Sequence, residues 1–310
     1  KLQKHDGLPD IVDSASGQVL KGHLVGKARQ EEMEYFFGMN VYAKVPESEA
    51  WDRTGKRPIG VRWVDVNKGD DDNPNYRSRL VAKDIRKKGE DAIFAPTPPL
   101  ESLRAVLSLV ASPQVWMSQQ HSWKGDDRLQ VSFVDISRAY FNAKTDPDKP
   151  VYVELPREDP DWGKGLCGRL NVHMYGTRPA ADGWHCEYSD MMEAGGFTRG
   201  ESSACVFKHE EKNLLCSVHG DDFTTVGPKS SLDWFVACLK TKYELKEASR
   251  LGPAAEDDKE GRVLNRIVRW SEGGLEYEGD PRQIERFICE LGLEGAKPAS
   301  TPGVKASHEQ

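Results

Sequence analysis

The chain has 310 residues, of which 37% are hydrophobic and 30% charged, and its formal net charge at pH 7 is −7. This composition is typical of a globular protein with a sizeable core and excludes a disordered or collagen-like chain. No apolar run approaches the roughly 20 residues that cross a bilayer, and the N-terminus carries no secretory signal. Six scattered cysteines without a CxxC pair indicate reduced thiols. We therefore expect an intracellular, cytoplasmic protein without a membrane partner, and the absence of an initiator Met suggests a piece of a longer protein.

Apolar periodicity and turn residues predict the elements of the first half of the chain. Residues 1–27 are polar and aperiodic, which predicts a poorly ordered lead-in. The elements expected next are a helix at 28–39, strands at 59–66 and 76–83, a helix at 101–111, strands at 129–135 and 151–155, and a helix at 180–194. The acidic turn at 70–72 does not match an EF-hand calcium loop, because its sixth position is Asn75 and its twelfth is Val81.

In the second half the pattern predicts two hairpins, each followed by a helix. The first hairpin spans residues 204–226, and Ser230 or Ser231 is expected to cap the helix that follows it. The second hairpin spans 263–278, and Asp280 is expected to cap the last helix, whose apolar stripe is Ile284, Phe287, Ile288 and Leu291. Together the elements predict an α+β fold in which helices pack on one side of an antiparallel sheet.

Two adjacent acids, Asp221 and Asp222, lie at the tip of the first predicted hairpin. An Asp pair is ordinary turn chemistry, but like charges repel, and a divalent cation relieves that repulsion. Asp135 closes the predicted strand 129–134. If this strand lies beside the strand 214–218, the three acids meet at one edge of the sheet. Three carboxylates with two Mg²⁺ ions would form a two-metal site for phosphoryl transfer.

A basic segment at residues 53–88 is the candidate phosphate-binding surface of this acidic chain, and the alternative is a solvated charged hairpin. Its cations are Arg53, Lys56, Arg57, Arg62, Lys68, Arg77, Arg79, Lys83, Arg86, Lys87 and Lys88. His173, His185 and Cys186 are the candidates for zinc, but their spacing fits no zinc motif, and we expect none there.

Several blocks in the right order resemble the reverse transcriptase of copia-type LTR retrotransposons, over residues 28–303. RSRLVAK at 77–83 followed by FAP at 94–96 resembles that family's ARLVAKG…FAP block, and MYG at 174–176 with Trp184 resembles its LYGLKQAPRAW block. The other blocks are ARQEEM at 28–33, RPIGVRWV at 57–64, VDISRAYFN at 134–142, HGDD at 219–222 in place of YVDD, and KPASTP at 297–302.

The resemblance implies a right-hand polymerase fold with an antiparallel palm sheet backed by helices. It places the fingers at 51–100 and 142–178, the palm at 101–141 and 179–270, and the start of the thumb at 271–296. Residues 297–310 would be a linker toward a ribonuclease H domain outside this chain. The parent Pol polyprotein would also carry an integrase.

The resemblance also implies the chemistry. The chain would extend a primer 3′-hydroxyl with dNTPs on an RNA or DNA template, using two Mg²⁺ ions, with Mn²⁺ as an alternative. Asp135, Asp221 and Asp222 would be the catalytic metal ligands, and Tyr140 the aromatic gate that excludes a 2′-hydroxyl. Arg77, Arg79 and Lys83 are the candidates for contact with the triphosphate.

Four residues depart from the family pattern near this site: His219 and Gly220 in the YVDD block, Pro179 in place of Gln, and Arg138 three residues after Asp135. Two alternatives to the reverse transcriptase therefore stay open. One is a catalytically degenerate palm fold that only binds nucleic acid. The other is an RNA-directed RNA polymerase, although such enzymes usually carry a second Asp where this chain has Tyr140.

Overall fold

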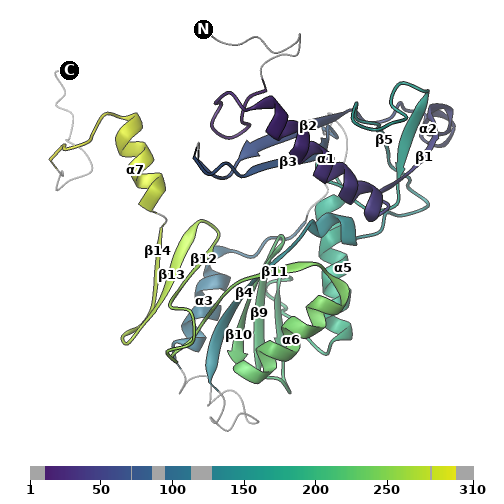
Figure 1. The fold of residues 1–310 in the computed structure, drawn as a ribbon. Helices are drawn as coiled ribbons and strands as arrows, with labels where there is room; N and C mark the ends of the chain where they lie inside the picture. The colour runs from purple at the N-terminus through teal and green to yellow at the C-terminus, as the bar shows by residue number, and fades with distance from the viewer. Residues whose placement is uncertain (1–10, 71, 86–94, 113–127, 280, 298–310) are drawn as a thin grey trace, which may run out of the picture.

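The computed structural model describes residues 11–70, 72–85, 95–112, 128–279 and 281–297 (Figure 1). The helices are α1 (Gly22–Gly38), α2 (Glu47–Thr54), α3 (Leu100–Val110), η1 (Ala139–Asn142), α5 (Ala180–Ala194), α6 (Lys229–Lys242) and α7 (Pro281–Glu290). The strands are β1 (Tyr42–Pro46), β2 (Val61–Asn67), β3 (Tyr76–Ala82), β4 (Leu129–Ile136), β5 (Tyr152–Glu154), β6 (Leu166–Leu170), β7 (Thr198–Arg199), β8 (Val206–His209), β9 (Leu214–His219), β10 (Asp222–Pro228), β11 (Leu245–Leu251), β12 (Glu260–Val263), β13 (Arg266–Ser271) and β14 (Gly274–Gly279).

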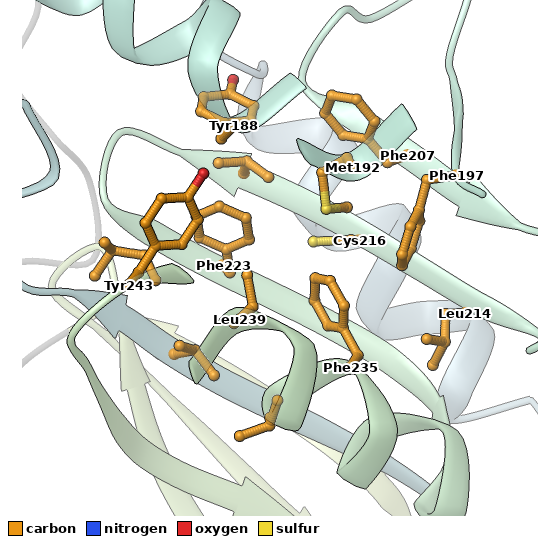
Figure 2. Close-up of a cluster of buried hydrophobic side chains, with 14 of the residues drawn as sticks. Tyr188, Met192, Phe197, Phe207, Leu214, Cys216, Phe223, Phe235, Leu239 and Tyr243 are labelled. Carbon is orange, nitrogen blue, oxygen red and sulfur yellow. The ribbon is translucent and has the colours of Figure 1, made fainter. Parts of the chain in front are cut away.

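An antiparallel sheet of six strands, in the order β11-β4-β10-β9-β8-β7, is the largest sheet in the described part of the chain and is called the central sheet below. One face packs against α5 and α6, where side chains such as Tyr188, Met192, Phe235 and Leu239 meet Phe223 of β10 (Figure 2). The other face packs against α3 and the β12–β13 hairpin through a second apolar cluster.

Helices therefore cover both faces of the central sheet, and the expectation that they lie on one side is wrong. The buried side of α3 consists of Leu103, Val106, Leu107 and Val110, and it contacts Val131 and Phe133 of β4. Seven of the eight residues of β4 are buried. Such a continuous buried run is typical of a strand that is covered on both faces.

The hairpin β2–β3 forms a separate sheet beside the central one, and α1 packs along β3 (Figure 1). Met33 and Phe36 of α1, Leu80 and Ala82 of β3 and Phe141 of η1 share one apolar cluster. A three-stranded sheet, β1-β6-β5, contributes Tyr42 and Val153 to the same cluster. The short 3₁₀ helix η1, which follows β4, therefore touches the α1 side of the molecule.

Residues 11–27, predicted as a poorly ordered lead-in, form defined structure. The carboxylate of Asp13 is buried and accepts hydrogen bonds from the N–H groups of Ala15, Ser16 and Asn67. Helix α1 begins at Gly22, earlier than predicted, because Val25 is buried on its inner side. Two glycines in its first turns lower the helix propensity and hide this start from sequence patterns.

Other predicted elements form with shifted ends. Helix α5 has the predicted bounds, whereas α6 begins at Lys229 after Pro228 and has no side-chain cap, so the expectation of a capping serine is wrong. The predicted cap Asp280 lies outside the described residues. The sequence analysis did not predict β1, α2, β6, β7, β11 or β12, most of which are short and polar.

Ile284 and Phe287 of α7, with Leu291 directly after it, form an exposed apolar stripe.

No described helix has both the length and the apolar character that a membrane crossing requires.

Candidate active site

Three aspartates lie at one end of the central sheet. Asp135 in β4 is paired in register with Asp222, the first residue of β10. Asp221 precedes β10, and its carbonyl accepts a hydrogen bond from the N–H of Ile136 at 2.9 Å. Because paired residues of neighbouring antiparallel strands project on the same face, Asp135 and Asp222 share one face of the sheet. The condition stated for their meeting, that strand 214–218 lies beside strand 129–134, is not met as such, because β10 lies between β9 and β4.

The loop between β9 and β10 consists of Gly220 and Asp221, since His219 pairs with Asp222. Gly220 has a φ of +64°, a left-handed conformation that glycine adopts without strain at the first position of such a loop. Its carbonyl accepts a hydrogen bond from the indole N–H of Trp184 at 2.8 Å. Glycine at position 220, where the family has Val, thus suits this backbone. Helix α5 holds the loop through the hydrogen bond of Trp184.

Burial and mutual repulsion raise the pKa of these carboxyl groups. Burial raises the pKa of Asp135, and the charge of Asp221 raises it further. Burial, followed by the charges of Asp221 and Asp135, raises the pKa of Asp222 to about 6. Burial and the two neighbouring charges account for the shift of Asp222, without a contribution from a hydrogen bond. The three carboxylates are therefore close enough to influence one another.

The donor set fits a divalent cation, because carboxylate oxygens are the ligands that Mg²⁺ prefers in proteins. Within the described residues, however, no three His, Cys, Asp or Glu side chains converge closely enough to form a metal-binding group. Repulsion between like charges opposes a closer approach of the three aspartates. They supply suitable ligands without forming a complete metal site in this geometry.

Cations of the β2–β3 hairpin lie near the aspartates. The charges of Arg77 and Lys68 lower the pKa of Asp135 against the effect of burial. Reduced hydration and the charges of Arg77 and Arg79 lower the pKa of Lys68, while Asp135 and Asp221 raise it. Coulomb interactions weaken with distance, so these cations and carboxylates lie close enough for their charges to affect one another. Cations opposite carboxylates are a suitable environment for a polyphosphate with its metal ions.

Lys83 lies in a different place. Its N–H donates to the carbonyl of Gly60 at 2.8 Å, and its side chain lines a pocket with Arg57 and Pro150. A Cβ at position 60 would lie 3.2 Å from Lys83 Nζ and 3.3 Å from a carboxylate oxygen of Glu154. The structure thus brings two of the three predicted cations near the aspartates. Lys68 was expected only as one cation of the basic segment and not as a contact of the triphosphate, although it directly follows β2, at the start of the turn that leads to Arg77.

The half-buried ring of Tyr140 lies next to the aspartates. Burial raises the pKa of Tyr140, and the charge of Asp221 raises it further. Tyr140 packs edge-on against Tyr175, with the ring centroids 5.1 Å apart. The guanidinium carbon of Arg79 lies 5.0 Å from the centroid of Tyr175. Tyr175, from the MYG block, therefore links the predicted gate to the cationic hairpin.

Two of the remaining departures from the family pattern, Arg138 and Pro179, have local explanations. Arg138 is directed toward Glu32 of α1 and forms an ion pair with it at 3.0 Å. Pro179 is the N-cap residue of α5, a position where the helix needs no N–H from it. His219 is partly buried, and its Nδ1 has no hydrogen-bond partner among the described residues.

The two histidines considered for zinc have other neighbours. His185 Nδ1 and the hydroxyl of Tyr188 form a hydrogen bond of 2.6 Å. His173 lies against Gly183 of α5, where an added Cβ would approach its Nε2 to 2.3 Å.

The comparisons with known proteins bear on this site directly. Residues 51–254 match the family described as reverse transcriptase (RNA-dependent DNA polymerase). The chain is also 29% identical over 315 residues to the "Retrovirus-related Pol polyprotein from transposon TNT 1-94" of Nicotiana tabacum. That alignment covers 97% of this chain and 21% of the relative, so the chain spans about a fifth of that polyprotein's length. The chain belongs to the reverse transcriptase family, as its resemblance to copia-type retrotransposon enzymes predicts.

Proposed function

We propose that this chain is an RNA-directed DNA polymerase that extends a primer 3′-hydroxyl with dNTPs, with Asp135, Asp221 and Asp222 as its catalytic carboxylates. The observation that carries the proposal is the register pair Asp135–Asp222 with Asp221 beside it, at the end of a sheet that is packed on both faces. The family match supports the reaction class.

The proposal includes a right-hand arrangement with the boundaries given above for fingers, palm and thumb. In its favour, all strands of the central sheet fall within the proposed palm at 101–141 and 179–270. The β2–β3 hairpin falls within the proposed fingers, and α7 within the proposed thumb. The neighbouring modules of the parent Pol polyprotein, integrase and ribonuclease H, belong to the same proposal.

In the proposed mechanism the three aspartates would hold two Mg²⁺ ions, which supply Lewis-acid activation of the primer hydroxyl and stabilise the leaving pyrophosphate. The side chains of Asp135 and Asp222 project from neighbouring strands, so they can hold a ligand between them on one face. The raised pKa of Asp222 reflects burial together with the negative charges of Asp221 and Asp135, and a bound cation would offset both. Trp184 keeps the loop of Asp221 in place through the Gly220 carbonyl.

The substrate would be held between the carboxylates and the hairpin. Arg77 and Arg79 would neutralise the triphosphate, and Lys68 joins them in this proposal because its charge interacts with Asp135 and Asp221. Lys83 is left out, since its side chain lies against Gly60, in the pocket lined by Arg57 and Pro150. Tyr140 would pack beneath the sugar, and its bulk would exclude a 2′-hydroxyl.

Primer extension on an RNA template with dNTPs and Mg²⁺ tests the proposal. Asp221→Asn removes a metal-ligating charge at nearly constant volume, and we expect it to lower the extension rate at least about a hundredfold. Asp52→Asn, on the exposed surface of α2, is the matched control and should keep the wild-type rate. Near-normal extension by Asp221→Asn would contradict the assignment of the aspartates.

The same assay separates the alternatives. If the wild-type chain binds a primer–template duplex but does not extend it, the chain is a nucleic-acid-binding remnant of the family. If it incorporates rNTPs as readily as dNTPs, the proposed role of Tyr140 is wrong.

A further inference from the structure

We propose that Glu32 and Arg138 are positioning residues that fix the ring of Tyr140 and thereby set the discrimination between deoxynucleotides and ribonucleotides. The inference rests on the proposed function, because it assigns a purpose to the Tyr140 gate. It concerns a contact between α1 and the turn that follows β4, and α1 precedes the residues that match the family, 51–254.

The side chain of Arg138 is held from two directions by α1. Its Nε and Nη2 donate to the same carboxylate oxygen of Glu32, at 3.1 and 3.0 Å. Its guanidinium carbon lies 3.3 Å from the centroid of the Tyr35 ring. Glu32 is 3% exposed, so the ion pair is largely shielded from water. A planar guanidinium that is both stacked and hydrogen-bonded has little freedom to reorient.

The backbone at Arg138 depends on this anchoring. Arg138 has a φ of +49°, in the left-handed region that is unfavourable for residues with a Cβ. In this conformation its carbonyl accepts the N–H of Phe141 at 2.9 Å, which begins η1. Tyr140 is the second residue of η1, so the direction of its ring follows from the geometry at Arg138.

Residues on either side of Arg138 are attached to different parts of the molecule. Ile136 and Ser137 are tied by backbone hydrogen bonds to Asp221 and Glu244, which fix the start of the turn. Beyond Arg138, Phe141 packs edge-on against Phe36 of α1, with the ring centroids 4.9 Å apart. Ala139 and Tyr140 also pack in the apolar cluster of α5. The turn is thus fixed to the central sheet before Arg138, and from Arg138 onward it is held by α1 together with α5.

The pair is poorly explained by stability alone. The second carboxylate oxygen of Glu32 is buried and has no hydrogen-bond partner among the described residues. Buried ion pairs with unsatisfied atoms are often no better for stability than apolar side chains. A role in fixing geometry near the reacting groups accounts for the pair, because small displacements there have large effects on rate.

The test is single-nucleotide incorporation by the full chain, with matched dNTP and rNTP. Glu32→Gln removes the charge that holds Arg138, and Arg138→Lys keeps the charge but loses the planar, stacked fork. We expect each to lower the ratio of kcat/KM for dNTP over rNTP by roughly tenfold. Glu31→Gln is the matched control, because Glu31 is the exposed neighbour of Glu32 on α1, and its ratio should stay within about twofold of wild type.

Two further measurements identify the route of the effect. In a Tyr140→Ala background, Glu32→Gln should cause no additional loss of discrimination, since the gate is already removed. Hydrogen exchange of the peptide spanning 137–143 should be faster in Glu32→Gln and Arg138→Lys than in wild type and Glu31→Gln.

An equal fall of kcat/KM for both nucleotides, with the ratio unchanged, would overturn the inference, as would an equal further fall of the ratio in the Tyr140→Ala background. If the wild-type chain does not extend a primer, the proposed function fails. Hydrogen exchange then decides the positioning claim by itself, and unchanged exchange at 137–143 overturns it.

Discussion

The central sheet and the β2–β3 hairpin face the same site but are held in different ways. The strands that carry the aspartates are covered on both faces by apolar clusters, one with α5 and α6 and one with α3. The hairpin that carries the cations has only two strands and packs against α1. The aspartates therefore belong to a sheet packed on both faces, and the cations to a two-stranded hairpin that packs in a smaller apolar cluster with α1, η1 and β5.

Polar contacts supplement the thin apolar packing of the hairpin. Asp65 of β2 is buried and accepts hydrogen bonds from Arg29 at 2.8 Å and from the hydroxyl of Ser78 at 2.7 Å. Arg29 also pairs with Glu158 at 3.0 Å, and Glu158 accepts the indole N–H of Trp63 at 2.9 Å. Such pairs act over short distances and need correct geometry, so the hairpin is easier to displace than the central sheet.

The largest predicted effect comes from removing the buried carboxylate of this network. Asp65→Ala leaves Ser78 without its acceptor and Arg29 with Glu158 alone, which we expect to cost about 3 kcal/mol of unfolding free energy. Urea denaturation measures the loss, and hydrogen exchange should show faster exchange in β2 and β3 than in β4 and β10.

Lys27→Ala is the matched control, because Lys27 lies on the same helix as Arg29 and forms an exposed ion pair with Glu31 at 3.9 Å. An exposed pair of this kind is worth less than about 1 kcal/mol. If Asp65→Ala costs no more than Lys27→Ala, or if β4 and β10 lose protection together with the hairpin, the two regions are not held independently.

A smaller loss is expected where the packing beneath the aspartates is tight. A Cβ at position 183 would lie 2.3 Å from His173 Nε2, so Gly183→Ala must move α5 or the imidazole. We expect a loss of roughly 2 kcal/mol, typical of overpacking. Because Trp184 holds the Gly220 carbonyl, primer extension should fall as well. In the double variant with His173→Ala the obstacle is gone, and extension should recover toward that of His173→Ala alone. If the double variant extends primers no faster than Gly183→Ala, the contact with His173 is not the cause of the loss.

The difference between the two regions also explains what the sequence could predict. The strands and helices of the central sheet carry clear apolar patterns, so the strand at 129–135, the helix at 180–194 and the hairpin around Asp221 and Asp222 were predictable. The pairing of β4 with β10 was not, since local patterns do not encode which strands become neighbours. Covering both faces of the sheet likewise depends on long-range packing, because the sequence of β4 alternates apolar residues with Gln130, Ser132 and Asp135, a pattern typical of a strand covered on one face.

The candidate site also contains residues that the sequence could predict and residues that only the fold reveals. The three aspartates could be predicted from motif and strand ends, but the division between Arg79 and Lys83 could not. Both are basic residues near the end of β3, and only the fold directs one toward Tyr175 and the other toward Gly60. The ion pair of Arg138 with Glu32 spans 106 positions of sequence, and no local signal connects them.

The smallest predicted effect is a dependence on pH that is confined to the central region. Burial lowers the pKa of His173, His185 and His209, all of which are buried. The segment from β2 to β3, residues 61–82, contains no histidine. A histidine whose pKa is lower in the folded chain binds protons more readily when unfolded. Its contribution to stability is thus complete above the unfolded pKa of about 6.5 and is lost as the pH falls below that value.

We therefore expect the unfolding free energy to decrease as the pH falls from about 7 to 5, and His185→Gln to flatten this decrease because it removes one of the titrating groups. Hydrogen exchange at the lower pH, corrected for the intrinsic rate, should report the loss in β8 to β10 before it appears in β2 and β3. His23→Gln, on the exposed surface of α1, is the control and should leave the slope unchanged. An equal slope in wild type and His185→Gln would mean that buried histidines do not govern the acid stability of the central sheet.

The carboxylates that raise one another's pKa oppose this trend, since a carboxyl group with a raised pKa favours the folded chain as the pH falls. If the decrease of the unfolding free energy with falling pH is steeper in Asp135→Asn than in wild type, the two contributions within the same sheet are separated.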